Sequence, residues 1–403
     1  MLLNKERFEE KIAENDLDAI VATSPANVFY TSDLCPYGRC YTLLPSNPNI
    51  EPAIIASISG PAPIALMSPP WISDVRYYGE FYTTTAFAKE PLTKAERKLI
   101  EAQESWEKTK IKDPISLLID LLKEKGITKG KIGVDETNLP SDHPFWQRVE
   151  TDLPNLETFP ARQIFTEIRM VKSDEEIKRM QEAIRITEKA WNTSLDQARE
   201  GITEREFSDI YQHTIISEGG RIRSRMGYYG PPIGFGRRTA FTDIAFPSDY
   251  ILQRGDIIRL DGGAKYLGYG CDMGRTAVVG EPSERIEKYW KILYEGENLA
   301  IQMARPGIKA SDIFNAVMDK IKKSGIDYYT RHHTGHGWGL EGYDPPLISP
   351  SNHTKLEEGM VFCFETPYYE VGWGGLIHED IVVITKDGAR YLTTYEDELR
   401  IID

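Results

Sequence analysis

Residues 255–276 read GDIIRLDGGAKYLGYGCDMGRT, and this stretch decides the architecture of the carboxy-terminal half of the chain. Two runs of strand-forming residues around a glycine-rich centre predict a β-hairpin that turns at Tyr266-Leu267. Directly opposed positions in a hairpin share one face of the ladder, and Asp261 and Asp272 fall opposite each other about that centre. We therefore expect the two carboxylates to converge. Like charges across a ladder are destabilising unless a positive charge lies between them, and the neighbouring glycines leave room for one.

Three further polar residues lie on strand-rich segments of the same half. His336 lies in the run HHTGHGWG, residues 332–339, whose glycines favour a loop or an irregular strand over a helix. Glu365 ends the apolar run of residues 360–364, and Glu379 begins a strand that extends to Ile384. Taken singly, each of these residues is explained at least as well by an ordinary structural role.

Taken together, the five residues predict a metal site. Asp261, Asp272, Glu365 and Glu379 contribute four carboxylates, and His336 contributes one imidazole. Two divalent cations would supply the four positive charges that neutralise the carboxylates. Oxygen-rich ligation with a single histidine favours manganese, iron or cobalt over structural zinc.

The same half contains an internal repeat with an offset of 106 residues. The run AREGI at 198–202 returns as ARPGI at 304–308, and Gly219 corresponds to Gly325. Each copy predicts a turn, an amphipathic helix and a glycine that ends it. Two copies of one unit indicate pseudo-twofold symmetry, with chance similarity of two helix openings as the alternative.

The amino-terminal half has a different pattern. A helix around residues 8–14 precedes a strand at 18–23, and a turn at Ser24-Pro25 leads to Asn27-Val-Phe-Tyr30. Strand patterns at 53–56 and 131–135 alternate with charged helical stretches such as 95–109, which is typical of an α/β domain. A capping box at Ser173-Asp-Glu-Glu176 starts a long helix. We therefore expect two domains, at residues 1–167 and 168–403.

Composition excludes several classes of protein. The 403 residues exceed the roughly 100 to 200 of an ordinary domain. The net charge of -14 repels nucleic acids and anionic membranes. Charged residues occupy positions 1–10, where a signal peptide needs an apolar run, and no stretch approaches the roughly 20 apolar residues of a membrane span. We expect a cytoplasmic protein that binds neither nucleic acid nor membrane.

The four cysteines are Cys35, Cys40, Cys271 and Cys363. They contain no CxxC pair, which argues against a disulfide scaffold or a structural zinc site. Buried, unreactive thiols are the simplest interpretation. Cys271 and Cys363 lie near the proposed ligands, and we expect their side chains to point to the opposite face of their strands.

The motifs above resemble those of one family. The Asp-x10-Asp spacing, the histidine-containing glycine loop, Glu365-Thr-Pro and Glu379-Asp-Ile-Val occur in the order found in the pita-bread metallopeptidases, which include prolidase, aminopeptidase P, methionine aminopeptidase and creatinase. The chain is most similar to prolidase, the Xaa-Pro dipeptidase, and to aminopeptidase P. The resemblance implies an α/β amino-terminal domain at 1–167 and an α+β pita-bread catalytic domain with internal pseudo-twofold symmetry at 168–403.

The resemblance also implies roles for the ligands. Asp261 would chelate one metal ion, Asp272 and Glu379 would bridge two ions, and His336 with Glu365 would complete the second site. Manganese is the expected metal, with iron, cobalt and zinc as alternatives. Glu365 would be the general base that takes a proton from the nucleophilic water and passes it to the leaving amine.

Four positions bear on the substrate. The family's peptidases carry a substrate-side histidine where the alignment places Ile244, and a second one where Tyr343 stands; a tyrosine hydroxyl can still donate a hydrogen bond. The arginine usual two residues before the bridging glutamate is Ile377 here. His332 fits the position that helps to form a proline pocket, with an exposed loop histidine as the alternative for it and for His333.

Three functions follow in order of preference. The first is a hydrolase of the prolidase or aminopeptidase P type, which would cleave Xaa-Pro bonds of small peptides. The second is a pita-bread enzyme acting on a small non-peptide metabolite, which the two missing histidines support. The third is a non-catalytic binding protein, against which the retained carboxylates argue because they repel one another. The resemblance suggests a homodimer.

Overall fold

The computed structural model describes residues 1–35, 38–60, 71–84, 89–222, 233–242 and 247–403. The chain divides into two compact units, Met1–Arg169 and Met170–Asp403. The division falls at the end of helix α7 (Arg162–Met170), whereas the sequence predicts a boundary after residue 167.

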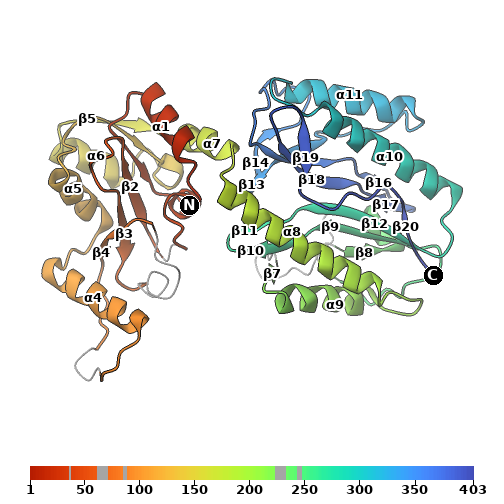
Figure 1. The fold of residues 1–403 in the computed structure, drawn as a ribbon, viewed down its shortest axis with the longest axis horizontal. Helices are drawn as coiled ribbons and strands as arrows, with labels where there is room; N and C mark the ends of the chain where they lie inside the picture. Colours follow the sequence, from red (N-terminus) through yellow and green to blue (C-terminus); the bar gives the residue numbers. More distant parts are fainter. Residues whose placement is uncertain (36–37, 61–70, 85–88, 223–232, 243–246) are drawn as a thin grey trace. The chain divides into compact units, whose positions relative to one another are not determined.

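The first unit is built around a six-stranded mixed sheet with the strand order β4-β3-β2-β1-β5-β6 (Figure 1). Its elements are α1 (Lys5–Glu14), β1 (Ala19–Ala22), α2 (Pro25–Ser32), β2 (Tyr41–Pro45), β3 (Ala53–Ser57), β4 (Asp74–Tyr78), α4 (Lys94–Thr109), α5 (Pro114–Glu124), β5 (Lys129–Val134), a short 3-10 turn (Glu136–Asn138), α6 (Pro144–Asp152), β6 (Asn155–Pro160) and α7.

Local sequence explains most of this unit. Buried Val21 of β1 and Ile55 of β3 pack in one cluster with Leu118 and Leu122 of α5, so the α5 face and the sheet share a core. The predicted turn at Ser24-Pro25 is instead the start of a helix. Ser24 accepts a hydrogen bond from the backbone N–H of Asn27, and Pro25 takes the first helical position, where its missing N–H costs nothing.

The second unit contains a nine-stranded sheet whose main path is β14-β13-β15-β18-β12-β9-β8, with β19 paired to β18 and β20 paired to β12. Smaller sheets join β7, β10 and β11, and join β16 and β17. Its elements are α8 (Asp174–Leu195), α9 (Glu204–Ser217), β7 (Arg221–Ile222), β8 (Ile233–Phe235), a 3-10 turn (Gly236–Ala240), β9 (Ile257–Gly262), β10 (Ala264–Tyr266), β11 (Tyr269–Gly270), β12 (Met273–Val279), α10 (Glu284–Met303), α11 (Ala310–Lys323), β13 (Gly335–Gly339), β14 (Gly342–Leu347), β15 (Val361–Glu365), β16 (Tyr368–Glu370), β17 (Gly374–Leu376), β18 (Glu379–Ile384), β19 (Ala389–Tyr391) and β20 (Arg400–Ile402).

The capping box predicted at Ser173 begins helix α8. The Ser173 side chain accepts from the N–H of Glu176, and the Glu176 carboxylate accepts from the N–H of Ser173. Glu176 is almost completely buried and also accepts a hydrogen bond of 3.0 Å from the Tyr269 hydroxyl. Glu176 thus caps the amino terminus of α8 and also joins α8 to β11 by a hydrogen bond.

The repeat in the sequence is a repeat in the structure. Helix α9 spans Glu204–Ser217 and helix α11 spans Ala310–Lys323, an offset of 106 residues at both ends. Each is followed by a glycine with positive φ, Gly219 at 87° and Gly325 at 120°. Because only glycine adopts this conformation at little cost, the same residue type ends both helices.

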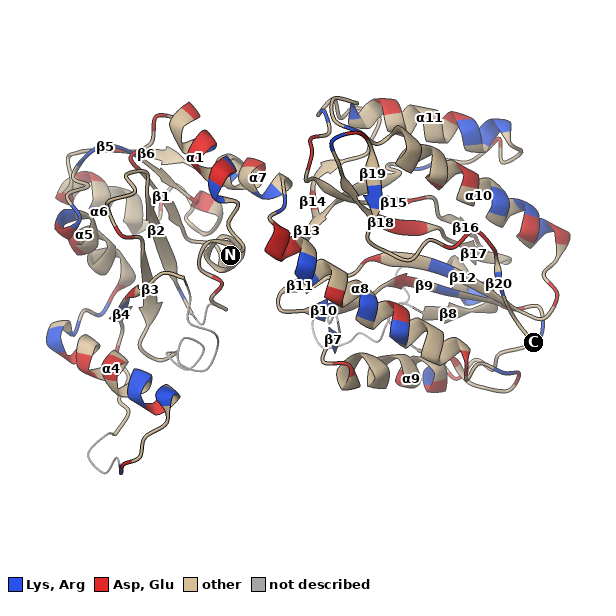
Figure 2. Cartoon of the chain, viewed as in Figure 1, with Lys and Arg blue, Asp and Glu red and all other residues tan. Residues whose placement is uncertain are grey.

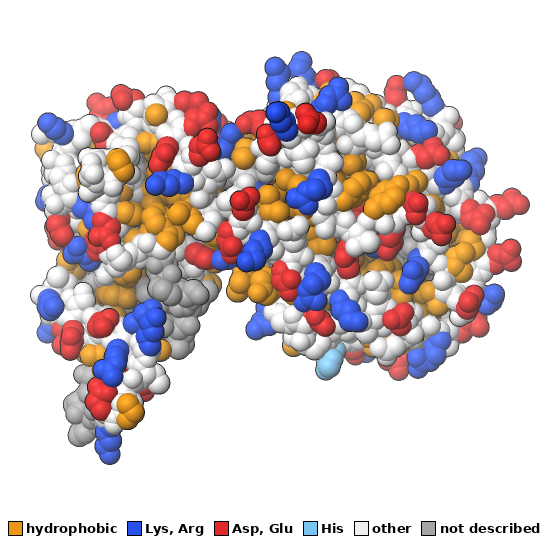
Figure 3. Space-filling model, viewed as in Figure 1, with side chains coloured by type: hydrophobic (Ala, Val, Ile, Leu, Met, Phe, Trp, Pro, Cys, Tyr) orange, Lys and Arg blue, Asp and Glu red, His pale blue; other side chains and the backbone are white. Residues whose placement is uncertain are grey.

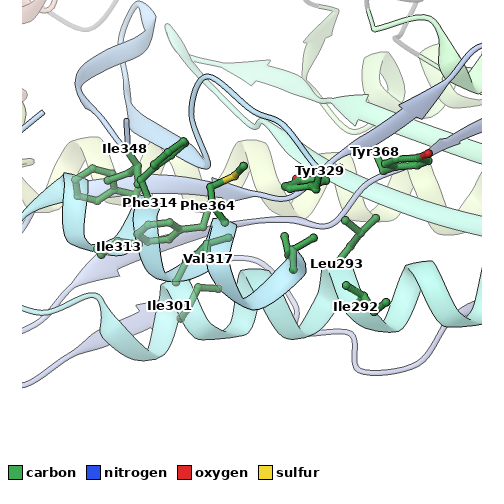
Figure 4. Packing of buried hydrophobic residues seen from close by; sticks show 14 of the residues in the cluster. Ile292, Leu293, Ile301, Ile313, Phe314, Val317, Tyr329, Ile348, Phe364 and Tyr368 are labelled. Atoms are coloured by element: carbon green, nitrogen blue, oxygen red, sulfur yellow. The ribbon is translucent and has the colours of Figure 1, made fainter. Parts of the chain in front are cut away.

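Helices α10 and α11 pack on one face of the large sheet. The core between them joins Leu293 and Ile301 of α10, Val317 of α11 and Phe362 and Phe364 of β15 in one buried cluster, part of which is drawn in Figure 4. Since side chains alternate along a strand, residues 363 and 365 of β15 point to the opposite face. That opposite face carries the site described below.

The outer faces of the helices are charged. Figure 2 shows Lys, Arg, Asp and Glu along α8, α10 and α11, whereas most of each strand is uncharged. On the face seen in Figure 3, acidic and basic side chains are interspersed over the second unit. None of the helices that the structure describes is both long enough and apolar enough to cross a membrane.

Candidate metal centre

Three of the predicted ligands lie in one row across the large sheet. Asp261 of β9 is opposite Gly274 of β12, Gly274 is opposite Glu379 of β18, and Glu379 is opposite Glu365 of β15. Residues directly opposed in an antiparallel sheet point to the same face. The sheet therefore places these carboxylates on one face, and the glycine in the row adds no side chain between them.

Asp272 joins this row by a different register from the predicted one. The hairpin turns at Leu267-Gly268, with φ angles of 43° and 93°, so that Asp261 pairs with Gly274 and not with Asp272. The predicted register is thus wrong by two residues. A shift of two keeps every side chain on its face, and oxygens of Asp261, Asp272 and Glu379 lie within 4.8 Å of one another.

His336 lies on β13 opposite Cys363, and both are buried. The strand is irregular as predicted, because its pairing with β14 shifts between His336 and Gly337. The Nδ1 atom of His336 lies 3.1 Å from the carbonyl oxygen of Gly337. A proton on Nδ1 donates to that oxygen and leaves the lone pair on Nε2, which lies 3.9 Å from Oε1 of Glu379.

Glu365 has two basic neighbours that the sequence does not assign to the site. Nδ1 of His333 lies 3.0 Å from Oε1 of Glu365, and Nη2 of Arg331 donates to Oε2 at 3.1 Å. Both lie in the irregular segment just before β13, where a spacing of two residues alone gives no signal of a shared direction. His333 is buried, so the exposed-loop interpretation is wrong for it.

The carboxylates differ in their electrostatics. Burial, followed by the charges of Asp272 and Glu365, raises the pKa of Glu379 well above its ordinary value. Desolvation also raises the pKa of Asp261, although the charge of Arg259 acts in the opposite direction. Burial opposes ionisation of Glu365 as well, but contact with His333 and the charge of Arg331 outweigh it and hold the pKa of Glu365 below its ordinary value.

These residues fit divalent cations. The pKa values of Glu379 and Asp261 are raised chiefly because burial disfavours their charged forms, with neighbouring carboxylates adding to the effect, and a bound cation would favour the charged forms. Carboxylate oxygens with one imidazole suit divalent ions of the manganese, iron or cobalt type.

The face also carries a thiol. Cys363 lies two residues before Glu365 on the same strand. Its Sγ atom and ligand atoms of His336 and Glu379 lie within 4.8 Å of one another, so the prediction that Cys363 points away from the site is wrong.

Four further positions are predicted to bear on the substrate, namely Tyr343, His332, Ile377 and Ile244. The Tyr343 ring stacks on His336 with centroids 3.8 Å apart, and 57% of the tyrosine is exposed. Desolvation and the charge of Glu365 raise the pKa of Tyr343, which therefore stays protonated. His332 is exposed and contacts the ring of His333. Ile377 is buried against Gly274, and Ile244 lies outside the described residues.

Comparison with known proteins gives a consistent result. The model of metallopeptidase family M24 matches residues 178–386, slightly more than half of the chain. An Xaa-Pro dipeptidase of Pyrococcus horikoshii is 28% identical over 390 residues, covering 97% of this chain and 96% of the relative.

Two solved structures share the fold over nearly the whole length. An X-Pro aminopeptidase from Thermotoga maritima has a TM-score of 0.73 at 24% identity and covers 99% of both chains. An Xaa-Pro dipeptidase from Bacillus anthracis has a TM-score of 0.75 at 23% identity and covers 98% of both chains. At these identities the likeness shows the fold alone.

The chain belongs to metallopeptidase family M24. Its fold is the pita-bread fold preceded by an α/β unit, as the sequence predicts, and membership makes it a hydrolase of a family that uses divalent metal ions.

Proposed function

We propose that the chain is an Xaa-Pro peptidase whose two divalent ions are held by Asp261, Asp272, His336, Glu365 and Glu379. The observation that carries this proposal is the row formed by Asp261, Gly274, Glu379 and Glu365 across adjacent strands, with Asp272 beside it. The Xaa-Pro dipeptidase that is similar over 97% of the chain supports the choice of substrate. When bound, the ions would lower the pKa of water toward 7 and so provide a nucleophile at neutral pH.

The protein's own groups would manage the protons. His333 and Arg331 hold Glu365 ionised at neutral pH, which is the state in which it can accept a proton from the attacking water. The same carboxyl group can then donate that proton to the leaving amine. Tyr343 keeps its proton and can donate a hydrogen bond to the oxygen on which negative charge develops. His332, exposed beside this site, would contact the substrate.

Metal analysis combined with a substrate panel tests the proposal. We expect the purified protein to bind two divalent ions per chain and Asp272→Ala to lose this binding, whereas the exposed Asp387→Ala serves as a matched control that retains it. The manganese-loaded protein should cleave Xaa-Pro dipeptides faster than matched Xaa-Ala dipeptides. Unchanged metal stoichiometry in Asp272→Ala would show that the ligand assignment is wrong.

A second candidate substrate class is a small non-peptide metabolite. Tyr343 favours it, because a phenol covers His336 where the family resemblance places an imidazole. Cyclic and amidated metabolites in the same panel distinguish the two classes, since a peptidase should leave them intact.

Three finer properties are part of the proposal. We infer manganese as the metal, a homodimer as the assembly and the cytoplasm as the location. Metal analysis of protein purified without added metal, light scattering of the eluted peak and cell fractionation check them in turn.

A further inference from the structure

Arg259 is a buried cation beside the candidate metal centre. It lies on β9 two residues before Asp261, so both side chains point to the same face of the sheet. The side chain is completely buried, and its Nη1 atom lies 3.8 Å from Oδ2 of Asp261. A charge in this position is costly unless other groups compensate it.

Its compensation by hydrogen bonds is incomplete. Its Nη2 atom donates to the carbonyl oxygen of Phe241 at 2.6 Å and approaches that of Thr242 at 3.4 Å. Nε and Nη1 have no hydrogen-bond partner among the residues that the structure describes. Burial of a guanidinium with two unsatisfied nitrogens is destabilising by itself. A role in balancing the carboxylates explains why a cation lies here.

Tyr369 connects the arginine to the same oxygen. Its hydroxyl donates to Oδ2 of Asp261 at 3.3 Å, and the Cζ atom of Arg259 lies 4.7 Å from the centre of its ring. Arg259 and Tyr369 therefore contact each other and approach one oxygen of one proposed ligand. Two groups that converge on Oδ2 restrict how the carboxylate of Asp261 can rotate.

The sheet explains why an arginine at this position can act on the cluster. Arg259 pairs with Thr276 on β12, and the Thr276 hydroxyl exchanges hydrogen bonds of 3.0 Å with the backbone of Ile377. This row lies next to the row that contains Asp261, Gly274 and Glu379. At the other end of the row from Arg259, Ile377 contributes an apolar side chain. The positive charge in this row therefore comes from Arg259 on β9.

We propose that Arg259, together with Tyr369, is a positioning residue that orients Asp261 and balances its charge, and that it thereby sets the affinity for the metal ion that Asp261 holds. This inference rests on the proposed metal centre. It predicts a selective effect. The ion held mainly by His336 and Glu365 should be affected much less than the ion held by Asp261.

Calorimetric titration of the metal-free full chain with Mn²⁺ tests this. Arg259→Met, which keeps an unbranched side chain but removes the charge, should weaken one of the two binding events by about 10- to 100-fold, the usual cost of losing a group behind a ligand. The other event should stay within about twofold. Arg259→Lys, which keeps the charge, should lose less affinity than Arg259→Met, and Tyr369→Phe should weaken the same event.

A double-mutant cycle shows whether Arg259 acts through Asp261. In an Asp261→Asn background, Arg259→Met should change the binding event that Asp261→Asn weakens by less than about twofold more, because the carboxylate it acts on is absent. An equal loss in both binding events, an unchanged affinity in Arg259→Met, or the same loss in both backgrounds would overturn the inference. If Arg259→Met does not fold, Arg259→Lys and Tyr369→Phe decide it, and wild-type affinity in both would overturn it.

The titration also separates this inference from the proposed function. Failure of the wild-type chain to bind divalent ions would refute the metal centre itself. Two ions in the wild type with no selective change in the variants would refute only the role of Arg259.

Discussion

Gly274 stands in the middle of the row of carboxylates, and its replacement by alanine is a direct test of the geometry. Gly274 does not require a positive φ, so alanine introduces no backbone strain there. The added Cβ, however, would lie 2.6 Å from Cγ1 of Ile377 and 2.8 Å from Cβ of Glu379. Gly274→Ala therefore acts by steric contact, and one of the residues it displaces is Glu379, a proposed bridging ligand.

The structure gives the size of the effect. Carbon atoms pack best at about 3.5 Å or more, so the Cβ atom of Glu379 must recede by about 0.7 Å. Insertion of a methyl group into a packed site costs about 1 to 3 kcal/mol of unfolding free energy. A misplacement approaching 1 Å in an active site costs up to about 10²-fold in rate. We expect Gly274→Ala to lower kcat by about 10- to 100-fold and to weaken metal binding.

Gly388→Ala is the matched control, because a Cβ at Gly388 would meet nothing within 4 Å and the residue does not require a positive φ. Urea unfolding followed by tryptophan fluorescence, metal titration and Xaa-Pro hydrolysis should distinguish the two variants. Wild-type metal affinity and kcat in a folded Gly274→Ala protein would refute the argument that the row needs an empty position between Asp261 and Glu379.

Three other outcomes follow from the site. Glu365→Gln should lower kcat by at least about 10²-fold while some metal stays bound, and near wild-type turnover with full metal content would assign the base to another group. Tyr343→Phe keeps the ring on His336 but removes the donor, so kcat should fall by about 10²- to 10³-fold without loss of metal; unchanged kcat would make the tyrosine a wall of the site. Because the folded-state pKa values of Glu379 and Asp261 are raised, the stability they contribute is present below their ordinary pKa values and is lost as pH rises through the raised values. A bound cation favours the charged carboxylates, so the difference in melting temperature between metal-loaded and chelator-treated protein should grow as pH rises above the ordinary carboxyl pKa of about 4, and a constant difference would contradict the raised pKa values.

Local patterns were sufficient for much of the fold. The capping box at Ser173 and the glycines that end α9 and α11 are decided by residues within one or two turns, so they can be recognised without the rest of the chain. The sequence misplaces the turn of the hairpin because Leu267 takes a positive φ, a conformation for which a leucine gives no signal. The error was harmless only because it was an even number of residues.

The order of residues by itself determined the repeat of 106 residues, the class of fold and the five candidate ligands, because helix periodicity, capping and motif spacing are properties of short segments or of their order. Only the tertiary structure decided which side chains meet. It placed His333 and Arg331 on Glu365 while His332 stays exposed, turned Cys363 toward the site, and brought Arg259 and Tyr369 to the same oxygen of Asp261. Such contacts depend on strand register and on segments far apart in the sequence, 34 residues for Arg331 and Glu365 and 108 for Tyr369 and Asp261, and a change of one residue in register would turn a strand side chain to the other face.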